Sequence, residues 1–220
     1  TATASRTART GADAGASSVT QPATTENITA RALTITAATD TKEYNATLSS
    51  AGVPTLTSGA LQGSDSVTWT QTFDNKNVGT GKTLTPAGVV TDGNSGNNYS
   101  YTYTPNATGV VTAKALTVLN VTANEKVYDA GLVASLNLGT AAFSGVIGGD
   151  TVVIDTSSAT GAFADKHIGT AKTVTVSGIA KTGADSGNYS ITQPATTANI
   201  IARALTITAA TDTKEYNATL

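Results

Sequence analysis

An exact internal repeat constrains this chain more than any other feature of its sequence. Residues 30–48, ARALTITAATDTKEYNATL, recur letter for letter at 202–220. The match extends upstream at the same offset, because 33 of the 40 positions in 9–48 are identical in 181–220. Self-similarity at a fixed period is the signature of tandem-repeat architectures. We therefore expect a chain of serially repeated modules.

A weaker similarity within the long period indicates a repeating unit of about half that length. Residues 115–132 are similar in sequence to 32–48. A spaced pattern also returns 90 positions later, and in its first copy it comprises Phe73, Lys76, Gly79, Thr80, Lys82 and Thr83. We expect a window on a longer tandem array, divided into the C-terminal part of a preceding module (1–31), a divergent module (32–114), a second module (115–203) and the first strand of a following module (204–220).

Composition and patterning indicate an all-β fold. Threonine supplies 44 of the 220 residues, and its β-branched side chain packs well on a pleated sheet. The second module keeps no helical period, and its apolar residues alternate in short runs between Gly, Asn and Asp clusters. Such spacing predicts tandem immunoglobulin-like β-sandwich modules. The strands expected in the second module are 116–122, 134–138, 151–154, 172–177, 189–192 and 197–201.

No linker separates the modules. Neither Pro nor Gly occurs from 195 to 208, and 110–118 likewise runs without a break from one module into the next. The last strand of one module must therefore lead into the first strand of the next within a residue or two, around 113–115 and 202–204. Because the array has no flexible spacer, we expect an elongated, semi-rigid rod.

Charge and residue types exclude several classes of function. The net charge is −2 and the 13 basic residues are scattered, so we expect no nucleic-acid partner. No apolar run reaches the roughly 18 to 20 residues that span a bilayer, so we expect no membrane insertion of this segment. His167 is the only histidine, and the sister module has Asn77 in its place, which predicts an exposed turn residue. We expect no cofactor, no catalytic residue and no enzyme.

The aspartates leave one alternative open. Asp150, Asp155, Asp165 and Asp185 stand in turn contexts, which favours turn capping. A weak calcium site between modules is the alternative, although no Asp-x-Asp loop of an EF-hand is present. Turn capping is the simpler interpretation, and we expect no metal ligand.

The aromatic residues are expected to be structural. Trp69 shares its strand parity with Val67 and Phe73, which predicts a core position rather than an exposed platform for stacking on sugars. Tyrosine recurs immediately after the first strand of each module, and its ring is expected to pack at the module end or the junction, with the hydroxyl reaching a backbone or solvent partner. These tyrosines are Tyr44, Tyr128 and Tyr216.

Five motifs of the second module occur in order, and together they resemble a known family. They are KVYD at 126–129, GD at 149–150, FADKHIGTAKTVTVSGI at 163–179, GADSGNYSITQP at 183–194 and ARALTI at 202–207. The set resembles the YDG repeat domains of long bacterial surface proteins and their MBG relatives. The first module is divergent, with Glu43-Tyr44-Asn45 at the Tyr-Asp signature. The residues of the structural family motif are Tyr128, Asp129, Gly149, Asp150, Phe163, Lys166, Gly169, Lys172, Gly187, Asn188 and Tyr189.

The resemblance implies a structural role outside the cell. Modules of this kind look like the tandem repeats of filamentous-haemagglutinin-like adhesins, where they form a stalk or fibre that projects a distal activity in adhesion or biofilm. The implied location is the bacterial cell surface or the secreted fraction. The implied partners are neighbouring repeats of the same chain and other copies in a fibre, while the distal ligand stays unassigned.

A repeat array that itself binds glycan or protein ligands is the alternative. Its mark would be an exposed aromatic residue at the same position of every module. Trp69 is not repeated in the second module, which counts against this alternative.

The sequons and the first ten residues give two further expectations. Sequons are frequent, and the resemblance implies possible glycosylation sites at Asn45, Asn98, Asn106, Asn120 and Asn188. Residues 1–10 depart from the later copy, with Ala2 and Ala4 where Val174 and Val176 stand. That strand is expected to have lost most of its buried area.

Overall fold

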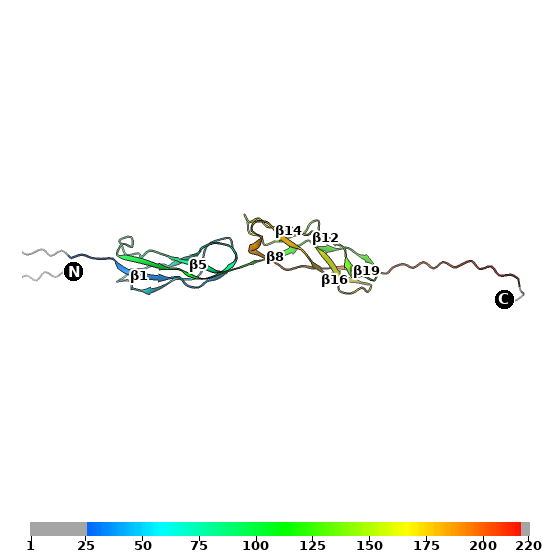
Figure 1. Ribbon diagram of the computed structural model, residues 1–220, viewed down its shortest axis with the longest axis horizontal. Coiled ribbons are helices and arrows are strands. Elements are labelled where there is room, and N and C mark those ends of the chain that lie inside the picture. Colours follow the sequence, from blue (N-terminus) through cyan, green and yellow to red (C-terminus); the bar gives the residue numbers. More distant parts are fainter. Residues whose placement is uncertain (1–25, 217–220) are drawn as a thin grey trace, which may run out of the picture.

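Residues 26–216 fold into β-structure with almost no helix. The computed structural model describes residues 26–216, so the divergent residues 1–10 lie outside the described part. Two groups of strands follow one another along the long axis of the molecule (Figure 1). The first repeat, residues 31–112, comprises β1 (Arg31–Thr36), β2 (Thr41–Glu43), β3 (Thr55–Ser58), β4 (Thr70–Phe73), β5 (Gly79–Ala87), β6 (Tyr99–Thr104) and β7 (Asn106–Thr112).

Two curled sheets make up the first repeat. In one sheet, β1 pairs antiparallel with β3 and parallel with β6. The other has the order β2-β7-β5-β4, with β2 parallel to β7. Strand β5 shows why this sequence forms sheet: Leu84 and Pro86 are buried while Thr85 and Ala87 are exposed. The alternation places apolar residues on one face and small or hydroxyl residues on the other.

The second repeat, residues 114–201, contains more and shorter strands. Its elements are β8 (Lys114–Leu119), β9 (Thr122–Ala123), β10 (Lys126–Val127), β11 (Val133–Ala134), β12 (Leu136–Asn137), β13 (Ala142–Ser144), β14 (Val153–Asp155), β15 (Thr160–Phe163), β16 (Gly169–Ser177), β17 (Ala180–Thr182), the 3₁₀ turn η2 (Ser186–Asn188), β18 (Tyr189–Ile191) and β19 (Ala195–Ile201).

The two repeats share one strand order. In the second repeat β8 pairs antiparallel with β13 and parallel with β18, as β1 does with β3 and β6. Likewise β10, β19, β16 and β15 lie side by side in the order taken by β2, β7, β5 and β4. The sequence offset of 90 residues therefore corresponds to a repeated topology, as expected.

Apolar packing runs through both repeats. Leu33, Ile35, Val90 and Tyr99 form a cluster at one end of the first repeat. Val118, Val176 and Ile179 pack together in the second repeat, and Phe163, Val174 and Ile200 pack with Ala134 and Ala198 at its far end. A fourth cluster spans the boundary between the repeats.

Several expected strands differ in detail from the observed ones. The strand expected at 116–122 ends at Leu119, because Asn120 adopts a left-handed conformation with φ +61°. The strand expected at 134–138 is divided, since β11 pairs with β15 and β12 pairs with β9. The strand expected at 151–154 begins two residues later, at Val153. Local patterning did not indicate β10, β13, β15 or β17, which are short. Strands β10, β13 and β17 pair with strands distant in the sequence, and β15 pairs with the following strand, β16.

Trp69 and the C-terminal segment differ in part from what the sequence predicts. Trp69 is half-buried and packs against the cluster at the end of the first repeat, its ring 6.3 Å from that of Tyr101. It faces inward as expected, but it precedes β4 rather than lying in a strand. Residues 202–216, expected to include a first strand, contain no strand and are exposed. The identical residues of β1 are held by β3 and β6.

Candidate functional site

The boundary between the repeats is a packed interface. Strand β7 ends at Thr112 and β8 begins at Lys114, so Ala113 is the only residue between them. Beneath this connection one apolar cluster contains residues of both repeats. It combines Ala37, Tyr44, Phe73, Leu84 and Val111 from the first with Leu116 and Tyr189 from the second.

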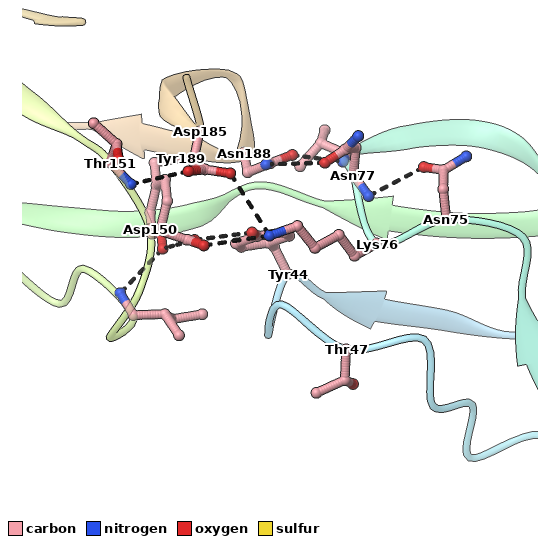
Figure 2. Close-up of polar contacts among 12 residues, drawn as sticks. Tyr44, Thr47, Asn75, Lys76, Asn77, Asp150, Thr151, Asp185, Asn188 and Tyr189 are labelled. Atoms are coloured by element: carbon pink, nitrogen blue, oxygen red, sulfur yellow. Dashed lines mark hydrogen bonds and ion pairs between the residues drawn. The ribbon is translucent and has the colours of Figure 1, made fainter. Parts of the chain in front are cut away.

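Asp150 is the polar centre of this junction (Figure 2). The hydroxyl of Tyr44, from the first repeat, donates to Oδ2 of Asp150 at 2.8 Å. The hydroxyl of Tyr189, from the second repeat, donates to the same oxygen at 2.6 Å. Lys76 Nζ lies 3.4 Å from Oδ1 of Asp150, whose side chain is only 4% exposed. The two tyrosine rings meet edge to face with centroids 5.4 Å apart.

The electrostatics of this group favour an ionised carboxylate and neutral phenols. The hydrogen bond from Tyr189 lowers the pKa of Asp150, against the opposing effect of burial, and Tyr44 and Lys76 lower it further. Burial, together with the bond to Asp150, raises the pKa of Tyr189 to about 12. Burial and the same carboxylate also raise the pKa of Tyr44. A buried charge is thus compensated by two hydroxyl donors and one cation, as its desolvation requires.

A second set of contacts lies beside Asp150. The side-chain amide of Asn188 accepts a hydrogen bond from the backbone N–H of Val78 at 2.9 Å and donates to Asn77 Oδ1 at 3.2 Å (Figure 2). Lys76 also lies 3.6 Å from Asp185. Asp185 in turn accepts the backbone N–H of Thr151. The β4–β5 turn of the first repeat is therefore attached to the second repeat through both backbone and side chains.

The first repeat contains the same Asp–Tyr arrangement at its own far end. The Tyr99 hydroxyl donates to Asp65 Oδ2 at 2.6 Å and accepts the backbone N–H of Gln62 at 2.9 Å. In the second repeat, the N–H of Ile147 donates to Tyr189 at 3.0 Å in the same way. We call this arrangement the socket, meaning Asp65 with Tyr99 in the first repeat and Asp150 with Tyr189 in the second.

The Tyr-Asp signature forms a turn closed by a lysine. Lys126 Nζ donates to the carbonyls of Gly131 and Val133 at 2.9 and 3.0 Å and pairs with Asp129 at 2.8 Å. Asp129 also accepts the N–H of Gly131 at 2.9 Å, and Ala130 between them has φ +65°. The hydrogen bond from Lys126 holds the pKa of Asp129 below its usual value.

The divergent signature of the first repeat builds the same turn. Asn45 accepts the N–H of Thr47 and a hydrogen bond from Lys42, and Ala46 has φ +61°. Lys42 also donates to the carbonyls of Thr47 and Ser49. An amide oxygen therefore replaces the carboxylate without changing the turn, which accounts for Asn45 where the second repeat has Asp129.

The remaining residues of the structural family motif lie in the core, beside β16 and in turns, and Lys166 is exposed in the turn before β16. Phe163 is buried in the core at the far end of the second repeat. Lys172 pairs with Asp165, while Gly169 begins β16 beside it and Gly187 lies in η2. Gly149, with φ +94°, turns the chain into Asp150, a conformation that favours glycine.

The tyrosines and aspartates match their predicted roles only in part. The ring of Tyr44 packs at the junction as expected, but its hydroxyl bonds a carboxylate of the next repeat rather than a backbone or solvent partner. Tyr128 is half-buried at the far end of the second repeat, and Tyr216 is exposed. Asp155 and Asp165 each accept a backbone N–H two residues on, as turn capping predicts. Asp150 instead accepts side-chain hydroxyls, a role that the sequence interpretation missed.

The glycosylation candidates differ in accessibility and stay predictions. Asn45, Asn98 and Asn120 are exposed, and Asn106 is half-buried. Asn188 is 6% exposed and both polar atoms of its amide are bonded at the junction, so a glycan there would require the junction to open.

Neither a metal cluster nor a membrane helix is found in the described part of the chain. Within residues 26–216, no three His, Asp or Glu side chains gather where they could hold a metal ion. The same residues contain no helix of the length and hydropathy needed to cross a bilayer. His167 is exposed in the turn before β16, where its backbone N–H donates to Asp165.

Comparison with known proteins identifies the repeats. No curated protein and no solved structure matches the chain. The family model of the YDG domain matches twice, at residues 29–107 and 112–198, and each match covers one repeat. Because these matches cover well over half of the chain, this protein belongs to the YDG domain family.

Proposed function

We propose that this chain is a structural segment of a longer array, a stalk or fibre that holds a distal activity away from a bacterial surface. In this proposal the repeats are immunoglobulin-like sandwiches arranged in a semi-rigid rod. They are related to MBG repeats and belong to an extracellular adhesin. It assigns the segment no catalysis and no cofactor.

One observation carries the proposal: the boundary between the repeats is a packed interface without a flexible linker. A flexible tether would place exposed Gly or Ser residues between two separate cores. Here a single residue separates β7 from β8, and one apolar cluster continues across the boundary. Burial of Tyr44 and Tyr189 within it makes bending costly, because bending would expose both rings to water.

The polar contacts give the joint a preferred orientation. Apolar contact alone would tolerate rotation, since it is not directional. Tyr44 donates to Asp150 and Val78 donates to Asn188, and these two acceptors lie in different loops of the second repeat. Together the two bonds restrict both the tilt and the twist of one repeat relative to the other. A joint of this kind favours reach, which is the property that a spacer requires.

A binding array receives little support from the exposed surface. Trp69 is half-buried, and Tyr99 and Tyr189 are occupied in the sockets. Among residues 26–216, the tyrosine that stands largely in water is Tyr216, in the segment without strands. No exposed aromatic residue therefore recurs at one position of both repeats.

Two measurements test the proposal. Small-angle X-ray scattering of the chain should give the profile of an elongated particle with two modules in line. Full-length proteins with fewer repeats should extend less far from the cell and keep the affinity of any distal domain. Tight, saturable binding of a glycan or of host cells by this chain alone would overturn the spacer function in favour of a binding array.

A further inference from the structure

The far end of the second repeat carries the same side chains that the first repeat presents at the junction. Tyr128, Lys166 and Ile168 take the places of Tyr44, Lys76 and Val78 in the repeat alignment. We call these three residues of the second repeat the donor end. Val78 packs against the shared cluster, whereas Ile168 is 60% exposed. A cavity of ≈ 420 Å³ opens beside it, lined also by Tyr128, His167 and Arg203.

The first repeat presents a complete socket at the opposite end of the molecule. Asp65 and Tyr99 are bonded as Asp150 and Tyr189 are. Within residues 26–216, Asp65 accepts its side-chain hydrogen bond from Tyr99 alone, whereas Asp150 also receives Tyr44 and Lys76. Asn98, which occupies the place of Asn188 in the alignment, is exposed.

We propose that the donor end of the second repeat docks the socket of a further YDG module, through the same contacts that join the two repeats described above. This inference rests on the proposed function, because it assumes that the chain acts within an array. The sequence favours one kind of docking partner. Residues 204–216 repeat 32–44 letter for letter, so the partner we propose is a module of the first repeat's type, with a socket like that of Asp65 and Tyr99.

Leu205 and Ile207 of the following segment are the counterparts of Leu33 and Ile35 in β1. Leu205 and Ile207 are 86% and 95% exposed, although the identical residues of the first repeat, Leu33 and Ile35, are fully buried. Their burial in the first repeat comes from the sheet β3-β1-β6 and the packing around it. A complete module at this position would bury the two side chains and bring its socket to the donor end.

The contacts of the second joint follow residue by residue. The Tyr128 hydroxyl donates to the socket aspartate, Lys166 approaches the same carboxylate, and Ile168 packs against the socket tyrosine. Two differences make this joint weaker than the first. Ser95 stands four residues before Tyr99, where Asp185 precedes Tyr189, so Lys166 gains one carboxylate partner instead of two. His167 replaces Asn77, which accepts a hydrogen bond from Asn188 in the first joint.

The test is a distance measurement in a chain long enough to form both joints. The full chain is extended after Leu220 with the sequence of residues 49–114, which completes a third module on the existing 204–220. The chain has no cysteine, so spin labels attach only at introduced ones. One pair, Thr72→Cys with Ser190→Cys, spans the first joint. The equivalent pair, Ala162→Cys with the added copy of Ser100 changed to Cys, spans the second.

Both pairs should give a narrow distance distribution with the same mean. Ile168→Asp should broaden the second distribution and leave the first unchanged, whereas Val78→Asp should do the reverse. Lys166→Ala, an exposed substitution that leaves the fold intact, should broaden the second distribution to a smaller extent. Circular dichroism of each variant establishes that the repeats remain folded.

Two outcomes would overturn the inference. One is a broad second distribution beside a narrow first one in the unsubstituted extended chain, and the other is a narrow second distribution that survives Ile168→Asp. Either result leaves the spacer function standing: the first outcome describes a stalk with one hinged joint, and the second a stalk whose second joint is held by other contacts. Tight ligand binding by the isolated chain would defeat the spacer function without changing either distance.

Discussion

Replacing Tyr44 by Phe removes one hydroxyl from the junction and leaves the ring in place. The hydroxyl lies 2.8 Å from a carboxylate that is nearly inaccessible to water. A hydrogen bond to a charged group contributes about 1.5–3 kcal/mol to stability. The bonds from Tyr189 and Lys76 to Asp150 remain, so the expected loss is that of a single bond and the free energy of unfolding should fall by about 1.5–3 kcal/mol.

Urea denaturation followed by two signals measures this loss. Trp69 is the only tryptophan and reports on the first repeat, while far-UV circular dichroism reports on both. A double-mutant cycle of Tyr44→Phe with Asp150→Asn should give a coupling energy of about 1–2 kcal/mol, within the range of directly bonded residues. Tyr99→Phe is the matched control, because it also removes a tyrosine hydroxyl bonded to an aspartate, in the socket of the first repeat far from the junction, and it should show no coupling to Asp150→Asn.

A coupling energy under about 0.5 kcal/mol would refute the reasoning, since residues without direct contact show values of that size. It would mean that the junction is held by its apolar cluster and that the orientation of the hydroxyl is incidental. The control distinguishes this result from a general effect of removing a buried phenol.

Three further predictions concern pH and the turns. The junction should be most stable between about pH 5 and 9. The folded state lowers the pKa of Asp150, so this residue stabilises the junction fully above its unfolded pKa and stops doing so as pH falls through the folded pKa. The folded state raises the pKa of Tyr189 to about 12, so the stabilisation from this neutral phenol is lost as pH rises from about 10. Thermal unfolding across this range with Asp150→Asn as control measures it, and an unchanged acid limb in that variant would contradict it. Asp129→Ala should lower the urea midpoint of the second repeat, because Lys126 loses its ion pair and Gly131 loses an acceptor for its N–H. Asp129→Asn should restore most of the midpoint, as Asn45 does in the first repeat. Tyr128→Ala should lower the free energy of unfolding by about 2 kcal/mol, less than the roughly 3–5 kcal/mol for a fully buried aromatic because the ring is half-buried. An unchanged urea midpoint would show that its packing contributes nothing.

The all-β class and the repetition of one topology could be predicted from the sequence because both depend on local patterns. Alternation along β5 and β16 reflects a two-residue period that any pleated strand must follow. The inward orientation of Trp69 follows from the same period. Exposure of His167 could be inferred because the sister module places Asn at that position.

The short strands could not be predicted from local sequence patterns. Strands of two residues such as β10 and β11 have too few positions to show a period. Their existence depends on pairing with β19 and β15, which lie far along the chain. Asn120 likewise ends β8 through a left-handed conformation that its sequence permits but does not require.

The junction was decided by tertiary structure. Tyr44 and Asp150 are 106 residues apart and meet because two modules pack end to end. No spacing pattern in the sequence indicates this contact. Asp150 looks like an ordinary turn aspartate in the sequence. Its bond to Tyr189 forms within the second module, and its bond to Tyr44 forms only when both modules are folded. The sequence by itself determined a repeated β-module and the absence of a linker, because strand periodicity and chain connection are local. Which side chains join one module to the next depended on the folded surfaces, because those contacts form only between completed sheets.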